Sequence, residues 1–268
     1  MRVHKVFQRN NNSSFTVKCL TKGVAINVGV NTNAEWGGFR GPIFSDGSFE
    51  FIHIPWKRKY GMIEPPPKKY DEMPYSSYVP DSLKNEYVLV SPDFYNCTYA
   101  STTDAPANKP ILGLKKGDTL LFYATLDFSD EKGERDAWIN LRWGAYIVGL
   151  FKIEFIYESL RHVLANEVAK GAFKEYTWFK SLLKLGIHDD RAPWVKGIEE
   201  ESGLLKKAIP LSRPEDPQKW SDPACDLFRT SRGKKLNVNK KAIFQTVLIC
   251  EGECLDKLLA RAHLQKEC

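Results

Sequence analysis

The residues with the clearest potential for binding chemistry lie in a glycine-rich, aromatic stretch between positions 25 and 56, with further flat aromatics up to position 143. An aromatic ring can stack on an unpaired nucleobase, which contributes about 1–3 kcal/mol per base whatever the base. A primary amide can then hydrogen-bond the edge of that base. We therefore predict a base-binding site. Its stacking candidates are Trp36, Phe39, Tyr123 and Trp143, and among the amides at 27, 31 and 33 we favour Asn31 and Asn33 as edge readers.

Each of these aromatic side chains, taken alone, is more often a core residue than a ligand contact. Trp36 is the best exception, because Gly37 and Gly38 follow it and leave little side chain to bury the indole.

Basic residues near this stretch and near the carboxyl end are suited to phosphate. Arg40 lies in the aromatic stretch, and the run from Arg229 to Lys241 holds six basic residues and no acidic one. Phosphate contacts position a nucleic acid without specifying its sequence. The phosphate candidates are Arg40, Arg232, Lys234 and Lys235, although a solvated loop explains the run equally well.

Motifs for metal, nucleophilic or phosphate-loop chemistry are missing. The five histidines are scattered, no CxxC or GxSxG pattern occurs, and GxxxxGK[ST] is absent. We expect no metal and no cofactor, and catalytic residues are unknown. Whether the protein is an enzyme is therefore left open. If it acts on a base or nucleotide, Asp46, Asp118 or His53 would supply the acid or base.

Alternating apolar residues predict the strands that must position these side chains. Period-two patterns occur at 25–31, 49–54, 119–126 and 145–155, with Asp127–Asp136 as a hairpin loop between the last two. Further strands are expected at 87–90, 194–198 and 242–250. Together they suggest a curved β-meander that closes on itself.

Helical spacing appears at 157–170, where Gly171 is the expected stop, at 176–185 and at 254–263. We divide the chain into a basic, acid-free extension at 1–24 and a single α+β domain at 25–268. The segment 55–80, rich in Pro, Tyr and Lys, is interpreted as a surface linker rather than a lid or docking loop.

The net charge of +6 permits a polyanionic partner without requiring one. No run reaches the roughly 18 uncharged apolar residues of a membrane span. Because no signal peptide is evident and the six cysteines show no paired spacing, we expect a reduced, cytoplasmic protein that does not bind membranes.

Several short motifs resemble the nucleotide modification associated domain 3 family over about residues 25–212. They are INVGVNT, GFRGPIF, DGSFEFIHIPW, GDTLLFYATL and SGLLKKAIPLS, in that order. The resemblance implies a prokaryotic setting in which DNA is modified or restricted. It assigns no catalytic residue.

The pair of segments at 116–123 and 147–153 is similar to the strand rhythm of PUA-like domains, among them the EVE, ASCH and YTH groups. That similarity implies a small barrel that holds a flipped or modified base. The long insert at 127–143 departs from the compact version and leaves the position of the pocket open.

We therefore expect an α+β fold built on a curved, mostly antiparallel β-barrel of PUA-like type with flanking helices. The predicted function is a module that binds nucleic acid or a nucleotide, DNA in preference to RNA, and recognises a modified base. The alternatives are an enzyme acting on a base or nucleotide and a scaffold that docks partners through the 57–80 loop. The oligomeric state cannot be inferred from the sequence.

Overall fold

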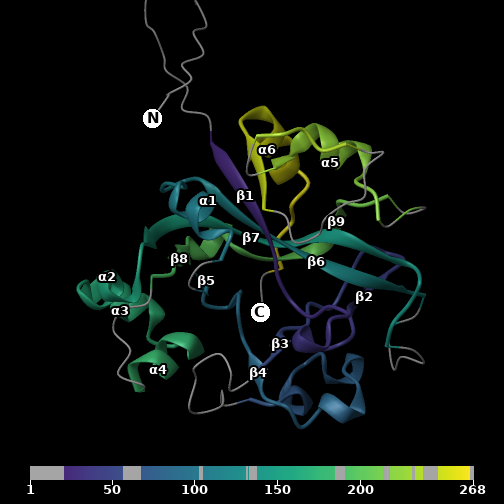
Figure 1. Cartoon of the computed structure of the whole chain (residues 1–268), viewed down its shortest axis with the longest axis horizontal. Coiled ribbons are helices and arrows are strands. Elements are labelled where there is room, and N and C mark those ends of the chain that lie inside the picture. Colours follow the sequence, from purple (N-terminus) through teal and green to yellow (C-terminus); the bar gives the residue numbers. More distant parts are fainter. Residues whose placement is uncertain are drawn as a thin grey trace, which may run out of the picture.

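The computed structural model describes residues 21–56, 68–102, 105–130, 132, 138–184, 191–213, 216, 218–230, 233–237 and 247–265. Within them the fold is α+β, as predicted, with one large sheet and helices around it (Figure 1). The strands are β1 (Lys22–Asn27), β2 (Gly41–Phe44), β3 (Ile54–Pro55), β4 (Val88–Leu89), β5 (Thr98–Ala100), β6 (Thr119–Ser129), β7 (Trp143–Tyr157), β8 (Trp194–Gly197), β9 (Gly203–Pro210), β10 (Arg229–Thr230) and β11 (Leu248–Glu251).

Short helices connect and cover these strands. The α-helices are α1 (Asn108–Leu112), α2 (Leu160–Leu164), α3 (Glu167–Phe173), α4 (Thr177–Lys184), α5 (Asp222–Leu227) and α6 (Glu253–Leu259). Single-turn 3-10 helices are η1 (Ala34–Trp36), η3 (Tyr70–Glu72), η4 (Ser76–Tyr78), η5 (Asp81–Leu83) and η6 (Glu199–Glu201). No described helix is long and apolar enough to cross a membrane.

The β6–β7 hairpin is the centre of the sheet and confirms the two longest predicted strands. β7 runs antiparallel to β6, while β1 and β2 pair in parallel with successive halves of the other edge of β6. The side chains on both faces of β6 are buried along nearly the whole strand, because other parts of the chain cover the sheet on either side. Alternation predicted the strand correctly, but not the burial of its second face.

The predicted PUA-like barrel is not confirmed. The strands follow the order β10-β11-β1-β6-β7-β8-β5, with β2 and β9 added beside β6 and β7, and this path does not close within the described part of the chain. β1 and β2 lie parallel to β6 rather than antiparallel, so the sheet is mixed. The predicted strand at 49–54 is reduced to β3 and one bridge from Phe49 to Ile43.

The helical region at 157–185 is confirmed, but as three short helices. The first helix ends at Leu164, and Asn166 caps α3 by accepting a hydrogen bond from the Ala169 backbone amide at 3.0 Å. Gly171 lies inside α3 and does not stop it. The terminal helix is confirmed as α6.

The interpretation of 55–80 as a surface linker is wrong for residues 68–80. Tyr70, Tyr75 and Tyr78 are buried and form a second hydrophobic cluster with Phe39 and Phe44. Residues 57–67 lie outside the described part. β1 begins at Lys22, so the last residues of the predicted extension belong to the sheet.

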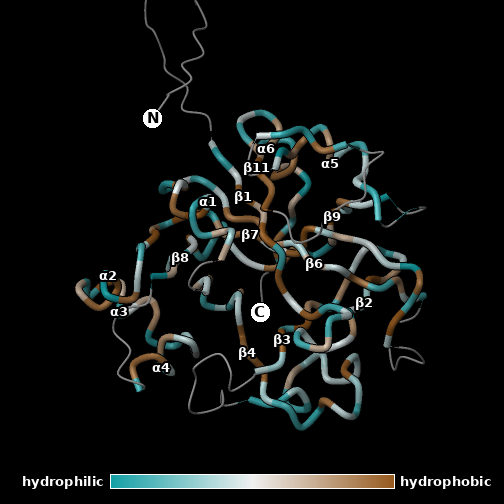
Figure 2. The backbone as a smooth tube through the Cα atoms, in the orientation of Figure 1, coloured by the Kyte–Doolittle hydropathy of each residue, from teal (hydrophilic) through white to brown (hydrophobic). Residues whose placement is uncertain are grey.

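Apolar residues concentrate in the central strands, and the connecting segments are more hydrophilic (Figure 2). The main cluster is built on β1, β6 and β7, and a third cluster joins α2, α3 and α4 to Trp194 of β8. The surface between the main and third clusters is where a cavity forms.

Candidate base-binding pocket

A cavity of about 430 Å³ opens where the carboxyl end of β1 meets β5 and α4. Its walls include Ile26–Gly29, Asn31, Trp36, Ser91, Tyr99–Thr102, Ala105–Ala107 and Trp178. This volume lies within the range of small-molecule sites in proteins. The described lining combines apolar side chains with amides and hydroxyls and contains no charged side chain.

Three aromatic rings share this cavity, each from a different element. Trp36 ends η1, Tyr99 lies in β5 and Trp178 in α4, and each is partly exposed. The Tyr99 ring is held edge-on by Phe122 of β6, with ring centroids 5.7 Å apart. Although the Trp178 ring is partly exposed, its Nε1 atom is buried and donates a hydrogen bond to no described group. Rings from three elements can surround a planar ligand.

The loop after β1 fixes Trp36 through backbone turns. The Asn31 backbone N–H donates to the Trp36 carbonyl oxygen at 3.1 Å, and the Gly38 backbone N–H donates to the Asn31 backbone carbonyl oxygen at 3.0 Å. Gly37 and Gly38 have φ of +114° and +77°, which side-chain-bearing residues rarely adopt. The two glycines noted beside Trp36 therefore make the turn possible.

Asn31 presents only half of its amide to the cavity. Its Oδ1 accepts a hydrogen bond from the Asn33 backbone amide at 2.8 Å, while its NH₂ group donates to no described residue. Asn27 also lines the cavity, and its side chain has no hydrogen bond to a described residue. One donor and one complete amide are thus available to a ligand.

A buried tyrosine supports the opposite wall. Tyr176 Oη accepts the Ala100 amide at 3.1 Å and lies 2.8 Å from Ser91 Oγ. Burial raises the pKa of Tyr176, so the phenol stays protonated. The contact ties Ser91 and Ala100, both lining residues, to the helical cluster.

Of the predicted base-binding residues, the pocket contains Asn31 and Trp36. Phe39 and Tyr123 are completely buried in two different clusters, where they cannot stack on a ligand. Asn33 caps η1 by accepting the Glu35 amide at 2.9 Å and does not line the cavity. The aromatic content of the stretch therefore served mostly to build the core.

Arg40 and Trp143 form a separate structural unit. Arg40 Nη1 lies 2.7 Å from Asp127 Oδ1, both side chains are buried, and the guanidinium lies 4.4 Å from the centre of the Trp143 ring. The other carboxylate oxygen accepts the Asn140 amide at 2.9 Å. The buried ion pair with Asp127 takes up the Arg40 guanidinium, so Arg40 is not placed to bind phosphate. Trp143 is half-buried beside Arg40 and does not line the cavity.

Lys234 and Lys235 are exposed in a turn beside β10 and do not line the cavity. The Lys234 amide donates to Thr230 Oγ1 at 3.2 Å, which closes the turn. Arg232 lies outside the described residues. The phosphate role of this run stays a prediction.

The three acid–base candidates, His53, Asp118 and Asp46, have separate structural roles. His53 is buried between Tyr75 Oη and the Pro92 carbonyl oxygen, at 3.0 and 3.2 Å, and burial lowers its pKa to about 4. Asp118 accepts the Lys22 and Lys115 amides and so shapes a turn. Asp46 accepts hydrogen bonds from Ser48, which lower its pKa to about 2. None of the three lines the cavity.

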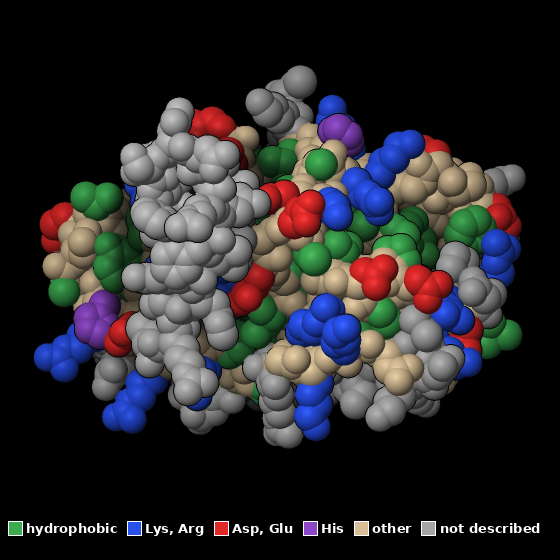
Figure 3. Space-filling model, turned by 90° about the horizontal axis from the view of Figure 1, so that it is seen from above, with side chains coloured by type: hydrophobic (Ala, Val, Ile, Leu, Met, Phe, Trp, Pro, Cys, Tyr) green, Lys and Arg blue, Asp and Glu red, His purple; other side chains and the backbone are tan. Residues whose placement is uncertain are grey.

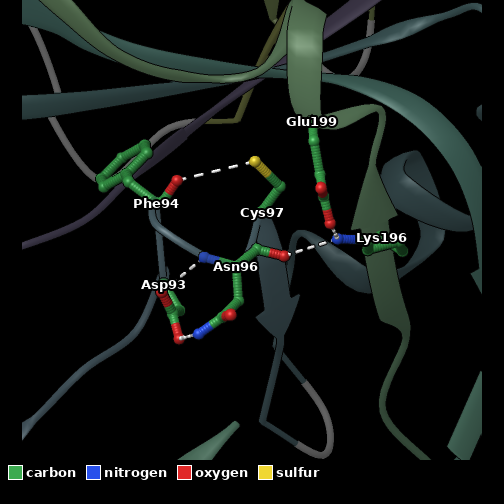
Figure 4. A network of polar contacts seen from close by, with 6 residues as sticks. All are labelled: Asp93, Phe94, Asn96, Cys97, Lys196 and Glu199. Carbon is green, nitrogen blue, oxygen red and sulfur yellow. Dashed lines mark hydrogen bonds and ion pairs between the residues drawn. The ribbon is translucent and has the colours of Figure 1, made fainter. Parts of the chain in front are cut away.

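A second polar cluster lies at the turn before β5 (Figure 4). Lys196 of β8 is almost buried, and its Nζ donates to the Asn96 carbonyl oxygen at 2.7 Å and to Glu199 at 2.8 Å. The nearby Cys97 is buried, which raises the pKa of its thiol to about 11. A protonated thiol is a poor nucleophile, so the cluster is not suited to nucleophilic catalysis. Its contacts instead join the turn before β5 to β8. Among the described residues, no three His, Cys, Asp or Glu side chains gather as a metal site requires.

Comparison with known protein families gives a match to the part of the chain that contains most of the pocket. The model of nucleotide modification associated domain 3 matches residues 22–245. The chain belongs to this family. No curated protein and no solved structure matches it. The family match extends beyond both ends of the motif resemblance found at 25–212.

Trp36, Tyr99 and Trp178 all lie within the span that defines the nucleotide modification associated domain 3 match. Sequence reasoning missed Tyr99 and Trp178. Tyr99 lies in a strand of only three residues, and Trp178 in a helix whose apolar face suggested packing alone. The cavity arises from elements distant in sequence, which no local pattern records.

Proposed function

We propose that this domain binds nucleic acid or a nucleotide by holding one base, in the preferred case a modified one, in the pocket between β1, β5 and α4. The observation that carries the proposal is the lining itself: three aromatic rings and unpaired amide groups around a cavity of about 430 Å³. Stacking supplies affinity for any base, and the amides supply the choice among bases. Family membership supports a setting in which nucleotides or DNA are modified.

Neutral lining suits a base better than a phosphate. A base is planar, uncharged and polar at its rim, so apolar walls and a few hydrogen-bonding groups satisfy it. We propose DNA in preference to RNA and a cytoplasmic, prokaryotic context, as the resemblance implies. The wider similarity to PUA-like domains rests on the strand rhythm alone, because the described strands form an open sheet rather than a closed barrel.

The test is binding of short single- and double-stranded oligonucleotides, with and without modified bases, over a salt series. Replacing Trp36 by alanine should weaken base-dependent binding by about 5- to 100-fold, the loss of one stacked ring. Affinity that depends on the base and falls only slowly with salt would support a base pocket.

A matched control is Tyr95→Ala, which removes a ring that is 77% exposed and outside the cavity. It should leave binding unchanged. Equal losses in the two variants, or binding that ignores the base and falls steeply with salt, would reduce the protein to a basic surface and overturn the proposal. Thermal unfolding of both variants separates lost contacts from lost folding.

An enzyme acting on the bound base is the second candidate from the sequence. Among the described residues, no carboxylate, histidine or cysteine side chain lines the cavity, so the geometry favours binding. Conversion of a bound nucleoside or oligonucleotide in the same samples, followed by mass spectrometry, would bring the enzyme forward instead.

A further inference from the structure

A second hollow lies directly behind one wall of the base pocket. It measures about 650 Å³ and shares Ala105 and Pro106 with the first cavity. Its remaining lining comes from α1 and from Arg191, just before β8. Because Ala105 and Pro106 line both spaces, the two spaces adjoin at these residues, which we call the 105–106 ridge.

The second hollow differs from the first in charge. Lys109 and Arg191 line it, and both are exposed. Neither forms an ion pair with any described residue. Lys22 adds a third cation beside it, since a Cβ built on the lining residue Gly113 would lie 3.6 Å from Lys22 Nζ.

The hollow is also tied firmly to the base pocket. The Ser101 amide donates to the Pro193 carbonyl oxygen at 3.1 Å, which joins the segment after β5 to the segment that carries Arg191. Asn108 Nδ2 donates to the Thr102 carbonyl oxygen at 3.0 Å, which joins α1 to the same segment. The cations are therefore placed by the chain that forms the pocket wall.

We infer that this hollow, lined by Lys109 and Arg191 with Lys22 close beside it, is the phosphate subsite for the nucleotide whose base fills the aromatic pocket. The inference rests on the proposed function and adds where the negative charge goes. A neutral pocket next to a hollow with unpaired cations matches the two halves of a nucleotide. This assignment replaces Arg40, whose charge is neutralised by Asp127.

The experiment compares ligands that differ only in phosphate. Calorimetry measures binding of the four ordinary deoxynucleosides and their base-methylated forms, and then of the corresponding monophosphates and of short single strands that carry the same base. Wild-type protein should bind the phosphate-bearing form of the preferred base about tenfold more tightly than the nucleoside, as two exposed charge contacts allow.

The decisive variant is Lys109→Gln with Arg191→Gln. It should lose the gain from phosphate, keep the affinity for the nucleoside, and reduce the salt slope of single-strand binding by about one to two. The control is Lys115→Gln with Lys116→Gln, two exposed lysines in the next turn that line neither space and remove the same charge. It should behave as the wild type.

The outcomes separate the two proposals. Nucleoside binding with no gain from phosphate, or a gain that survives in the double variant, overturns the phosphate subsite and leaves the base pocket standing. Absence of nucleoside binding in the wild type overturns both. A gain confined to single strands, and lost in the double variant, assigns the subsite to a backbone phosphate; a gain already present with monophosphates assigns it to the nucleotide itself.

Discussion

Asn31 and Asn33 show how two identical side chains, two positions apart, divide between a ligand and the backbone. Asn33 uses its oxygen to cap η1, whereas Asn31 uses its oxygen in the turn and its NH₂ group donates to no residue in the described part of the chain. An amide at a turn has both options, because its oxygen satisfies local backbone donors in Asx turns. The sequence names the residue type, and the turn geometry decides the role.

His53 gives a prediction at this scale. Burial lowers its pKa from 6.5 to about 4, so the imidazole of the folded protein stays neutral at pH values where the imidazole of the unfolded chain takes up a proton. The stability that this residue contributes is complete above pH 6.5 and is lost as the pH falls towards 4. Between pH 7 and pH 5 the loss should be about 2 kcal/mol, measured by urea unfolding.

The titration of the His53 imidazole by NMR checks the cause directly. Carboxylates also change the stability in this range, but they do not change the imidazole signal. A folded-state midpoint near 6.5 would show that the ring is hydrated and would contradict the buried position between Tyr75 and Pro92.

The aromatic residues of the 25–56 stretch mark the limit of sequence reasoning at the residue scale. The two glycines after Trp36 distinguish it from Phe39 in the sequence, and the structure places Trp36 at the cavity and Phe39 in the core. Nothing local distinguishes Arg40 as a buried ion-pair partner, because Asp127 lies 87 positions away. Contacts of that range belong to the fold and not to the motif.

At the scale of elements, Gly149 lets three strands meet. It is paired with Phe122 of β6 on one side and Leu204 of β9 on the other. A Cβ on Gly149 would collide with the Phe94 ring and lie 2.9 Å from the Gly203 carbonyl oxygen. The apolar spacing predicts β7 well, but the glycine at this position is explained only by the neighbouring strands.

Gly149→Ala should therefore destabilise the protein by about 2 kcal/mol, as overpacking against a ring and a backbone carbonyl does. Its matched control is Gly171→Ala, the same change inside α3, where the added Cβ meets no described atom within 4 Å apart from the local helix backbone. That substitution should stabilise by roughly 0.5–1 kcal/mol, because alanine favours a helix interior over glycine. Denaturant unfolding measures both, and equal effects of one sign would contradict this account.

At the scale of the whole molecule, the pocket connects two hydrophobic clusters. Ile26 belongs to the main cluster, while Ala100 belongs to the helical cluster and Trp178 packs against it. A ligand in the cavity touches both, so it should couple regions that otherwise open independently.

The corresponding prediction concerns hydrogen exchange. A saturating nucleoside or oligonucleotide at about 100 times its Kd stabilises the bound state by about 2.7 kcal/mol and should slow exchange in both β1 and α4. α6 does not line the cavity and serves as the internal reference. Protection limited to one of the two clusters would place the ligand elsewhere.

On the face that carries α5 and α6, Lys and Arg side chains are interspersed with Asp and Glu (Figure 3).

The sequence predicted the α+β class and the central hairpin, because these follow from local periodicity. It did not predict the parallel pairing of β1 and β2 with β6, since strand partners are chosen across long stretches of chain.

The position of β1 also determines when the fold can be completed. On one edge it pairs with β6, and on the other with β11, where Lys22 is opposite Glu251. A ribosome adds roughly 5–20 residues per second, so β1 waits on the order of ten to fifty seconds before its last neighbour has been synthesised. During that time the apolar run Val24–Ile26 lacks its cover, and nascent chains are open to chaperones or to pairing with other edges. Slower translation therefore lengthens the time for which the edge of β1 that pairs with β11 stays without its partner.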